Sequence, residues 1–368
     1  MNLNLCNICT KKIYQFYELK SFPINIYKQD KKNIKNKTLK LFFCKYCNHI
    51  SISRIKFENK IYKFYKKKVF FSKNYKPSEI SGKKKILEIS KEKPLSIYGL
   101  KVDHFTIFNK NYLNISKKYN KIIVSDCISN IYNIKEFFNK ISDCLEEKGE
   151  IEIFHHYGPG IIKNLNIDRI YFEHINNFSY KSLNILANQH EFIIKSFKLL
   201  EKKNFFKAIL IKKKILNLKK NIKIPNKNFD LISKKHLLKF KKKINLIKLK
   251  IKKEFQKKIN KNNMFNIYGY GASIGSVAII KFLNLEKYIN KLIDNFSELK
   301  FINLDKKIIK IEKKFHKNYN NLVIFNLAPR YKFLIKKKVF NNSDKKISYI
   351  ELLPSYNLIK KMPKAFNK

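Results

Sequence analysis

Four of the six cysteines occur in two close pairs whose spacing suits metal binding. Cys6 pairs with Cys9 and Cys44 pairs with Cys47, each with two residues between. Such a pair can form a turn that directs two sulfurs to one point, and two turns complete the tetrahedral shell of a structural Zn²⁺ site. The sequence therefore predicts a closed zinc site that folds a small domain. Unligated buried cysteines or two disulfides are the alternatives.

A phenol, a carboxylate and an imidazole lie within four positions, at Tyr171, Glu173 and His174. A tyrosine can donate a hydrogen bond to a developing oxyanion, a histidine can take a proton near neutral pH, and a glutamate can orient either. This combination suits removal of a proton from a carbon next to a carbonyl. The alternative is that the three are ordinary structural residues, because a histidine beside a glutamate is common outside active sites.

A glycine-rich turn follows a short apolar run near residue 266 and precedes an apolar helical stretch. Gly269, Gly271 and Ser273 lie in this turn. A strand, a glycine turn and a helix in succession present backbone N–H groups and a helix dipole to an anion. The spacing is Gly-x-Gly-x-x-x-Gly, which alone is a weak signal. Asp294 follows about 20 residues on, where an acidic residue that binds a ribose is expected, and it strengthens the prediction of a nucleotide site.

The elements that must position these residues alternate in type along the chain. Short apolar runs predict buried parallel strands, and between and after them lie stretches of helical periodicity. The expected strands are 86–89, 121–125, 150–154, 192–199 and 208–215, and the expected helices are 132–146 and 179–190. Lys148 and Gly149 are expected to end the first of these helices. The fold class predicted is α/β.

Composition shifts divide the chain into four segments. We expect a zinc-binding domain over 1–76, a Rossmann-like α/β core over 77–216, a basic linker and helix over 217–262, and a second Rossmann-like α/β domain over 263–368. Within the third segment, apolar residues recur on one stripe of a long helix. Packing against the neighbouring domain is the favoured interpretation of that stripe, and a membrane-surface or calmodulin-type helix is the alternative.

The charge is strongly basic but has an unusual composition. Lysine and arginine total 81 against 27 acidic residues, a formal net charge of +54, and only Arg54, Arg169 and Arg330 are arginines. Proteins that grip phosphates usually favour arginine, and lysine is accompanied here by an equally broad excess of asparagine and isoleucine. We interpret the excess as nucleotide bias with solvated lysines, and expect no specific nucleic-acid partner. Without an apolar run of about 18 residues or a signal pattern, we expect no membrane association and a cytoplasmic location.

The order of these features resembles the sugar C-methyltransferases over nearly the whole chain. In that family an N-terminal zinc-binding domain, a class I S-adenosylmethionine (SAM) methyltransferase domain and a C-terminal Rossmann-like domain occur together. The resemblance implies sugar biosynthesis: a base removes the acidic proton next to the ketone of a nucleotide-linked 4-keto-6-deoxysugar, and the enolate carbon attacks the SAM methyl. The implied cofactors are structural Zn²⁺ and SAM, and the implied partner is a nucleotide sugar.

The resemblance also assigns roles to residues. The Tyr-x-Glu-His positions of the family fall on Tyr171, Glu173 and His174, with His174 as the base. The glycine turn and the acidic strand end of its C-terminal domain fall on Gly269, Gly271, Ala272, Ser273, Asp294 and Asn295. The metal ligands are Cys6, Cys9, Cys44 and Cys47.

The first half of the core departs from the family pattern. Residues 91–94 read Lys-Glu-Lys-Pro where a class I methyltransferase has a glycine-rich turn, so no SAM-binding residue is assigned. About 30 residues separate the first strand from the strand at 121, too few for the usual helix, strand and helix. His155 and His156 replace a Glu-x-Pro-Tyr strand end. Two interpretations stay open: a SAM-dependent C-methyltransferase, and a noncatalytic homologue that binds sugar nucleotides or assembles with partners.

Overall fold

The computed structural model describes 5–24, 36–54, 85–90, 102–107, 115–200, 204–215, 230–259, 266–295, 297, 299–304, 307–313, 322–341 and 347–353. Two compact units divide the chain, and each draws on separate segments of the sequence. The first comprises Met1–Phe16, Leu41–Ile161 and Glu173–Ser233, and the second comprises Tyr17–Lys40, Ile162–Phe172 and Lys234–Lys368. The turn at 91–94 and the linker at 216–229 lie outside the described residues.

A four-stranded sheet carries the N-terminal cysteine pairs. Its order is β1-β2-β3-β8, with bounds β1 Tyr14–Pro23, β2 Asn36–Phe43, β3 Ile50–Ile52 and β8 Asn176–Asn177. Strand β3 pairs antiparallel with β8, with Ile50 opposite Asn177. Strand β8 comes from far along the chain, shortly after Glu173 and His174. This sheet therefore holds the residues that directly follow the predicted acid–base segment.

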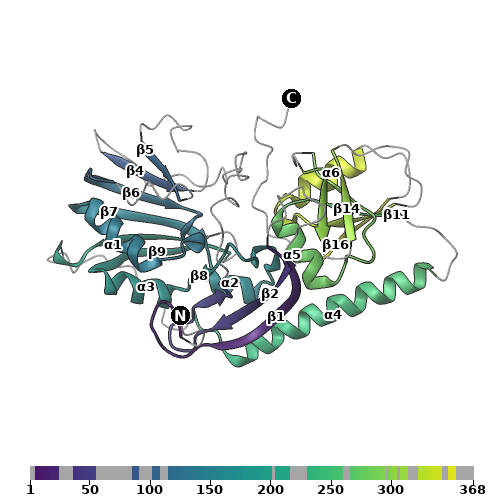
Figure 1. Ribbon diagram of the computed structural model, residues 1–368, viewed down its shortest axis with the longest axis horizontal. Coiled ribbons are helices and arrows are strands. Elements are labelled where there is room, and N and C mark those ends of the chain that lie inside the picture. Colours follow the sequence, from purple (N-terminus) through teal and green to yellow (C-terminus); the bar gives the residue numbers. More distant parts are fainter. Residues whose placement is uncertain are drawn as a thin grey trace. The chain divides into compact units, whose positions relative to one another are not determined.

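The first unit contains a six-stranded sheet in the order β5-β4-β6-β7-β10-β9 (Figure 1). The strands are β4 Ile86–Ser90, β5 Asp103–Thr106, β6 Tyr119–Ser125, β7 Leu145–His156, β9 Phe192–Leu200 and β10 Phe205–Lys212. Strands β5, β4, β6 and β7 run parallel, and β10 lies antiparallel between β7 and β9. The first strand of the sheet, β4, lies between β5 and β6, so the strand order reverses there. Ligands of open α/β sheets bind at the carboxyl ends of strands near such a point.

Two amphipathic helices belong to the core of this unit. Helix α1 (Ile134–Cys144) contributes Phe137 and Phe138, and helix α3 (Tyr180–Gln189) contributes Leu183. They join a buried cluster that includes Leu87, Ile122, Val124, Ile151 and Ile153 of the sheet. Both helices begin at side-chain caps, since Asn133 accepts from the Glu136 N–H and Ser179 forms a capping box with Ser182. The two predicted helices are confirmed. The short helical segments of this unit are η4 Ile128–Asn130 and η6 Lys213–Ile215. Helix α2 (Gly158–Lys163) begins in the first unit and ends in the second, and η5 (Ile167–Arg169) belongs to the second.

The expectation that Lys148 and Gly149 end helix α1 is wrong. The helix ends at Cys144, and β7 begins at Leu145, so Gly149 lies inside a strand. The pairing with β6 slips here, because Tyr119 pairs with Leu145 while Lys121 pairs with Glu150. A Cβ on Gly149 would lie 2.8 Å from the Leu145 side chain and 3.1 Å from the Asn120 carbonyl oxygen. The glycine thus serves an irregularity in the sheet rather than a helix stop.

The second unit contains another six-stranded sheet, in the order β13-β14-β12-β11-β15-β16. The strands are β11 Asn266–Tyr270, β12 Lys291–Ile293, β13 Phe301–Leu304, β14 Lys307–Glu312, β15 Leu322–Asn326 and β16 Ile347–Glu351. All pairings are parallel except that of β13 with β14. Helix α5 (Ile274–Leu283) follows β11, and η7 (Pro329–Tyr331) and α6 (Lys332–Asn341) follow β15. The prediction of a second α/β domain is confirmed.

The long basic helix α4 spans Lys234–Ile259. Its predicted apolar stripe is buried at Phe240, Ile244 and Ile251. The Phe240 ring meets the Phe282 ring of α5 at 6.4 Å and the Tyr17 ring of β1 at 5.8 Å, both edge to face. The buried part of the stripe therefore packs within the second unit, as the favoured interpretation expects.

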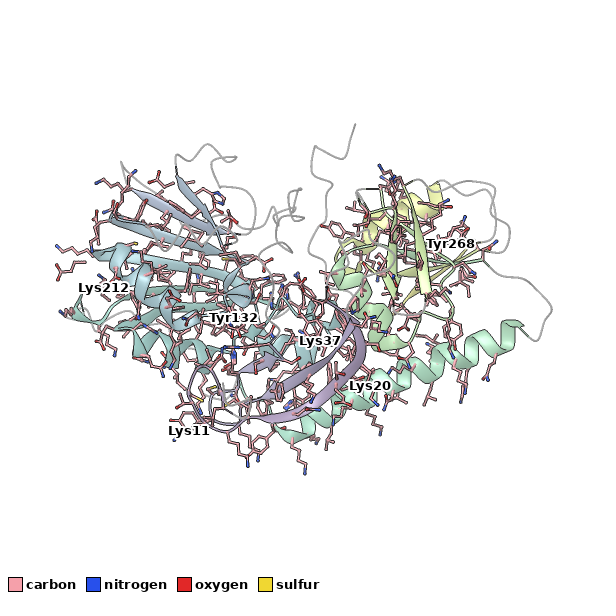
Figure 2. All side chains as sticks on the ribbon, in the orientation of Figure 1. Lys11, Lys20, Lys37, Tyr132, Lys212 and Tyr268 are labelled. Carbon is pink, nitrogen blue, oxygen red and sulfur yellow. The ribbon has the colours of Figure 1, made fainter. Side chains whose placement is uncertain are left out.

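Many lysines reach the solvent along the described chain. Figure 2 shows the side chains of Lys11, Lys20 and Lys37, all of which are exposed. Lys121 is an exception, buried in the first unit with its Nζ 2.9 Å from Glu152 and 3.1 Å from Glu150. Among the described residues, no helix combines the length and the apolar character needed to cross a membrane.

Candidate functional site

The two cysteine pairs form matching turns within the first unit. The Thr10 N–H donates to the Cys6 carbonyl and the Asn48 N–H donates to the Cys44 carbonyl, each at 2.9 Å. The residue after each pair adopts a left-handed backbone, with φ of 58° at Thr10 and 56° at Asn48. The Cys6 and Cys44 N–H groups in turn donate to the carbonyls of Lys11 and His49. Two copies of one turn thus present their sulfurs to a common point.

The four sulfurs fit a tetrahedral metal site. All four cysteines are buried, and their Sγ atoms lie within 4.8 Å of one another. The Cys6–Cys47 and Cys9–Cys44 pairs are separated by 3.6 and 3.5 Å, close to the ~3.8 Å edge of a tetrahedron built with Zn–S bonds of ~2.3 Å. Hydrogen bonding to Cys44 raises the pKa of the Cys6 thiol to about 12, and the Cys47 thiol lowers the pKa of Cys44. A divalent cation stabilises all four thiolates together, so the residues present fit Zn²⁺.

The cysteine turns hold the segment that follows His174. The Asn7 amide donates to the Asn176 side chain at 2.6 Å, and the Ser179 hydroxyl donates to the Cys47 carbonyl at 2.8 Å. The Gln189 amide donates to the Ile8 carbonyl at 3.1 Å. Because β3 also pairs with β8, the metal-binding turns fix both ends of a short stretch that runs from Asn176 to the start of α3.

A cluster of histidines lies at the carboxyl ends of two neighbouring strands in this unit. Asp126 directly follows β6, and His155 and His156 end β7. The Asp126 Oδ1 lies 3.3 Å from the His155 Nδ1 and 3.5 Å from the His156 Nδ1. His174 joins them, its ring centre 4.6 Å from that of His156 and 6.4 Å from that of His155. All three histidines are buried. The arrangement can transfer protons or hold a cation.

The predicted acid–base trio divides between the units. His174 is fully buried in the first unit within the histidine cluster, and Glu173 is buried in the same unit. Tyr171 is buried too, but its segment is grouped with the second unit. The structure therefore brings His174 together with His155 and His156, whereas the oxyanion-donor role of Tyr171 stays a prediction.

The predicted nucleotide turn is present in the second unit, and its residues already serve the turn itself. Gly271 has a φ of +114°, which favours glycine. Gly269 packs closely, because a Cβ there would lie 2.3 Å from the Leu327 side chain. Ser273 caps α5 in a capping box with Ser276.

The acidic residue predicted to bind a ribose also serves this turn. Asp294 accepts from the Ala272 N–H at 2.8 Å and from the Ser297 N–H at 3.0 Å. Its two carboxylate oxygens therefore join the glycine turn to the segment after β12. The sugar-binding role of Asp294 and of the glycine turn stays a prediction.

Sequence reasoning did not assign Asp126, His155 and His156 to a site. Asp126 is distant from the histidines in the sequence, and only the parallel pairing of Ser125 with Phe154 brings the strand ends together. A signal was available: a carboxylate directly after one buried apolar strand and two histidines at the end of the next expected strand. Residues at these positions converge on one edge of a parallel sheet.

No protein-family model and no curated protein matches the chain. Similar solved structures include the O-methyltransferase of a Brevibacillus brevis trans-AT PKS multienzyme in complex with S-adenosyl-L-homocysteine, at 10% identity over 36% of this chain and 68% of that chain, with a TM-score of 0.28. A SAM-dependent methyltransferase from Clostridium acetobutylicum is 9% identical over 34% and 83%, with a TM-score of 0.26. One from Methanosarcina mazei is 13% identical over 36% and 94%, with a TM-score of 0.28. Functional assignment therefore rests on this chain's own residues.

Proposed function

We propose that the first unit transfers a methyl group from SAM to a carbon next to a carbonyl, on a nucleotide-linked keto-deoxysugar. The observation that carries the proposal is the position of His174, fully buried and 4.6 Å from the His156 ring, among side chains from the carboxyl ends of β6 and β7. That edge is where open α/β sheets bind their ligands. It also holds Asp126, so a base and a charged orienting group lie together.

The chemistry assigned to the residues is removal of the α-proton. His174 takes the proton, which leaves an enolate whose carbon is nucleophilic. The His156 ring neighbours the base, and Asp126 lies 3.5 Å from the His156 Nδ1, so it sets the charge around that ring. SAM, when bound, supplies an electrophilic methyl group. The four-cysteine site contributes indirectly, because its turns hold Asn176 and Ser179 beside the segment that carries His174.

A second candidate function is a noncatalytic sugar-nucleotide binder. The observation that favours it lies on the other side of β4, where β5 is the edge strand of the described sheet and ends at Thr106. A carboxylate at that strand end is what a cofactor ribose requires. The acidic residue of β5 is Asp103, at the opposite end of the strand, where it accepts from the Tyr119 hydroxyl at 2.8 Å.

Solvent deuterium exchange separates the two candidates. The full-length protein is incubated in D₂O with nucleotide-linked 4-keto-6-deoxysugars, and loss of the α-proton signal is followed by NMR. We expect exchange that does not need SAM and that falls by roughly 10²- to 10⁴-fold in His174→Asn. His190→Asn is the matched control. His190 lies at the C-terminal end of α3, where its side chain hydrogen-bonds to Asn139 of α1. Adding SAM should then yield a methylated sugar.

The outcomes are distinct. Exchange that His174→Asn retains would contradict the role of His174. Binding of the sugar nucleotide with no exchange and no methylation in the wild type would support the noncatalytic candidate and contradict the methyltransferase.

A further inference from the structure

The contact of His155 and His156 with one carboxylate is unusual for adjacent residues of a strand. Successive side chains in a strand point to opposite faces of the sheet. Here both Nδ1 atoms approach the same Asp126 oxygen, and the two rings lie 3.7 Å apart between centres. Asp126 itself has a left-handed backbone, with φ of 44°. Three side chains from two strand ends therefore converge on one point at the rim of the sheet.

The distances suit a shared cation. The ligand atoms of Asp126, His155 and His156 all lie within 4.8 Å of one another. The two carboxylate-to-imidazole separations, 3.3 and 3.5 Å, match the ~3.3 Å edge of a tetrahedron with metal–ligand bonds of ~2.0–2.1 Å. Two histidines and one carboxylate form a common ligand set for divalent transition metals, and they leave a coordination position for a further ligand.

An outer contact orients one of the ligands. The His156 Nε2 lies 3.2 Å from the Asn177 Oδ1, and the Asn177 Nδ2 donates to the His174 carbonyl at 3.1 Å. Since the amide nitrogen is committed as a donor, its oxygen accepts from the His156 Nε2–H. The His156 Nδ1 then carries the lone pair, directed toward Asp126. Metal-binding histidines usually donate their other ring N–H in this way.

The surroundings also provide access. His155 and His156 are almost fully buried, whereas the Asp126 side chain keeps 24% of its surface exposed. A hydrated ion can therefore enter from the side of Asp126 and replace some of its water ligands with the two imidazoles.

From this geometry we propose that Asp126, His155 and His156 bind a divalent transition-metal ion, Zn²⁺ in the first instance, at a second site separate from the four-cysteine site. The site lies beside His174, so the cation can polarise a carbonyl oxygen of a bound substrate. It belongs wholly to the first unit. The inference does not depend on methyl transfer, because its test needs neither SAM nor a sugar.

Metal content of the full-length protein tests the proposal. Protein purified without chelators and loaded with Zn²⁺ is expected to hold about two ions per chain by mass spectrometry. His155→Gln and Asp126→Asn should each lower this to about one while the ion of the four-cysteine site remains. His190→Gln is the matched control and should keep both ions.

Cobalt substitution tells the two sites apart. Co²⁺ bound to thiolates gives a sulfur-to-cobalt charge-transfer band, whereas Co²⁺ bound to imidazoles and a carboxylate gives only ligand-field bands. His155→Gln should keep the charge-transfer band of the four-cysteine site and lose the ligand-field bands of the second site. If His155→Gln also loses the charge-transfer band through misfolding, Asp126→Asn at the partly exposed position gives the same readout. A wild type with about one ion per chain would overturn the proposal. Ligand-field bands of the second site that stay unchanged in both variants would overturn it too, and Asp126 would then contact the two histidines without a metal.

Discussion

The two units have the same kind of sheet, yet they place different groups at the point where the strand order reverses. In the first unit, the strand beside that point is followed by Asp126, which meets two histidines from the next strand end. In the second, the turn after β11 packs on the loop after β15: the Ser276 hydroxyl donates to the Leu327 carbonyl, and a Gly271 Cβ would lie 3.1 Å from the Ala328 Cβ. The first edge presents titratable side chains, whereas at the second edge two loops of the same unit pack against each other.

The difference indicates a division of labour. Proton transfer requires titratable side chains close together, and the described residues supply them at the edge of the first unit. The second unit offers backbone N–H groups at the start of α5, but Asp294 already accepts from the Ala272 N–H in that turn. A Cβ on Gly275 would lie 2.7 Å from the Asp168 carbonyl, so η5 also packs on the first turn of α5. Catalysis by the first unit and sugar-nucleotide binding by the second are therefore both proposals that rest on this difference.

The largest expected effect comes from the cysteine cluster that supports the first unit. Cys44→Ser removes one of four ligands, and structural zinc sites contribute about 10 kcal/mol or more of binding free energy to folding. We expect loss of one metal ion per chain and unfolding of the sheet that holds β8, with loss of deuterium exchange. Metal analysis and thermal denaturation measure this. Cys144→Ser is the control, because the Cys144 sulfur bonds to the Ile115 carbonyl away from the cluster. Full metal content in Cys44→Ser would contradict the zinc assignment.

A smaller effect is expected from a close approach next to the histidines. A Cβ on Gly158 would lie 2.5 Å from the Asn177 carbonyl oxygen and 3.0 Å from that of Phe178. Gly158→Ala must therefore displace the strand that orients His156, at a cost of about 1–3 kcal/mol. Deuterium exchange should fall by roughly 100-fold, since a misplaced catalytic group has about that effect. An unchanged rate of deuterium exchange in Gly158→Ala would show that the position of β8 does not affect the site.

The matching change in the second unit should affect binding rather than chemistry. Gly271→Ala forces an alanine to the left-handed φ of +114°, at a cost of about 1–2 kcal/mol. We expect weaker binding of the sugar nucleotide by calorimetry, with the exchange rate at saturating sugar close to that of the wild type. A loss of exchange as large as that of Gly158→Ala would show that both edges take part in the chemistry.

The smallest expected effect concerns the pH dependence of the sheet edge at β5. Burial lowers the pKa of His104 below its ordinary value of 6.5, and its Nε2 lies 2.9 Å from the Ser90 hydroxyl. The unfolded chain then binds a proton more readily than the folded one, so this contribution to stability falls as the pH drops through about 6.5. In urea unfolding at neutral and mildly acidic pH, His104→Gln should lose less stability on acidification than the wild type. An equal loss of stability in both proteins would show that His104 does not cause the pH dependence.

Features with a local signature were predictable from the sequence. The two cysteine turns, the strand and glycine turn before α5, and the stripe on α4 each depend on residues close together in the chain. The spacing of these residues in the sequence predicts which of them lie together, because a turn or a helix face brings residues at fixed short separations together. The predicted strands of the first unit were found by their apolar runs, for the same reason.

The histidine cluster and the limits of β7 depended on pairing between distant segments. Asp126 meets His155 only because β6 and β7 pair in parallel, and Gly149 lies inside a strand only because the pairing slips between Tyr119 and Lys121. Register of this kind is set by packing of whole strands, which no short window of sequence contains. The assignment of Tyr171 to one site with His174 stays a prediction, since these two neighbours in the chain fall in different units.

Calorimetric titration of the full-length protein with SAM, at about 0.3 M salt to screen lysine-driven association, tests the central claim most directly. The claim is that the first unit is a methyltransferase. Saturable binding of one SAM per chain, retained in Gly271→Ala, is the expected result. Absence of binding at millimolar SAM, in protein that holds its zinc, would contradict it and leave the noncatalytic function.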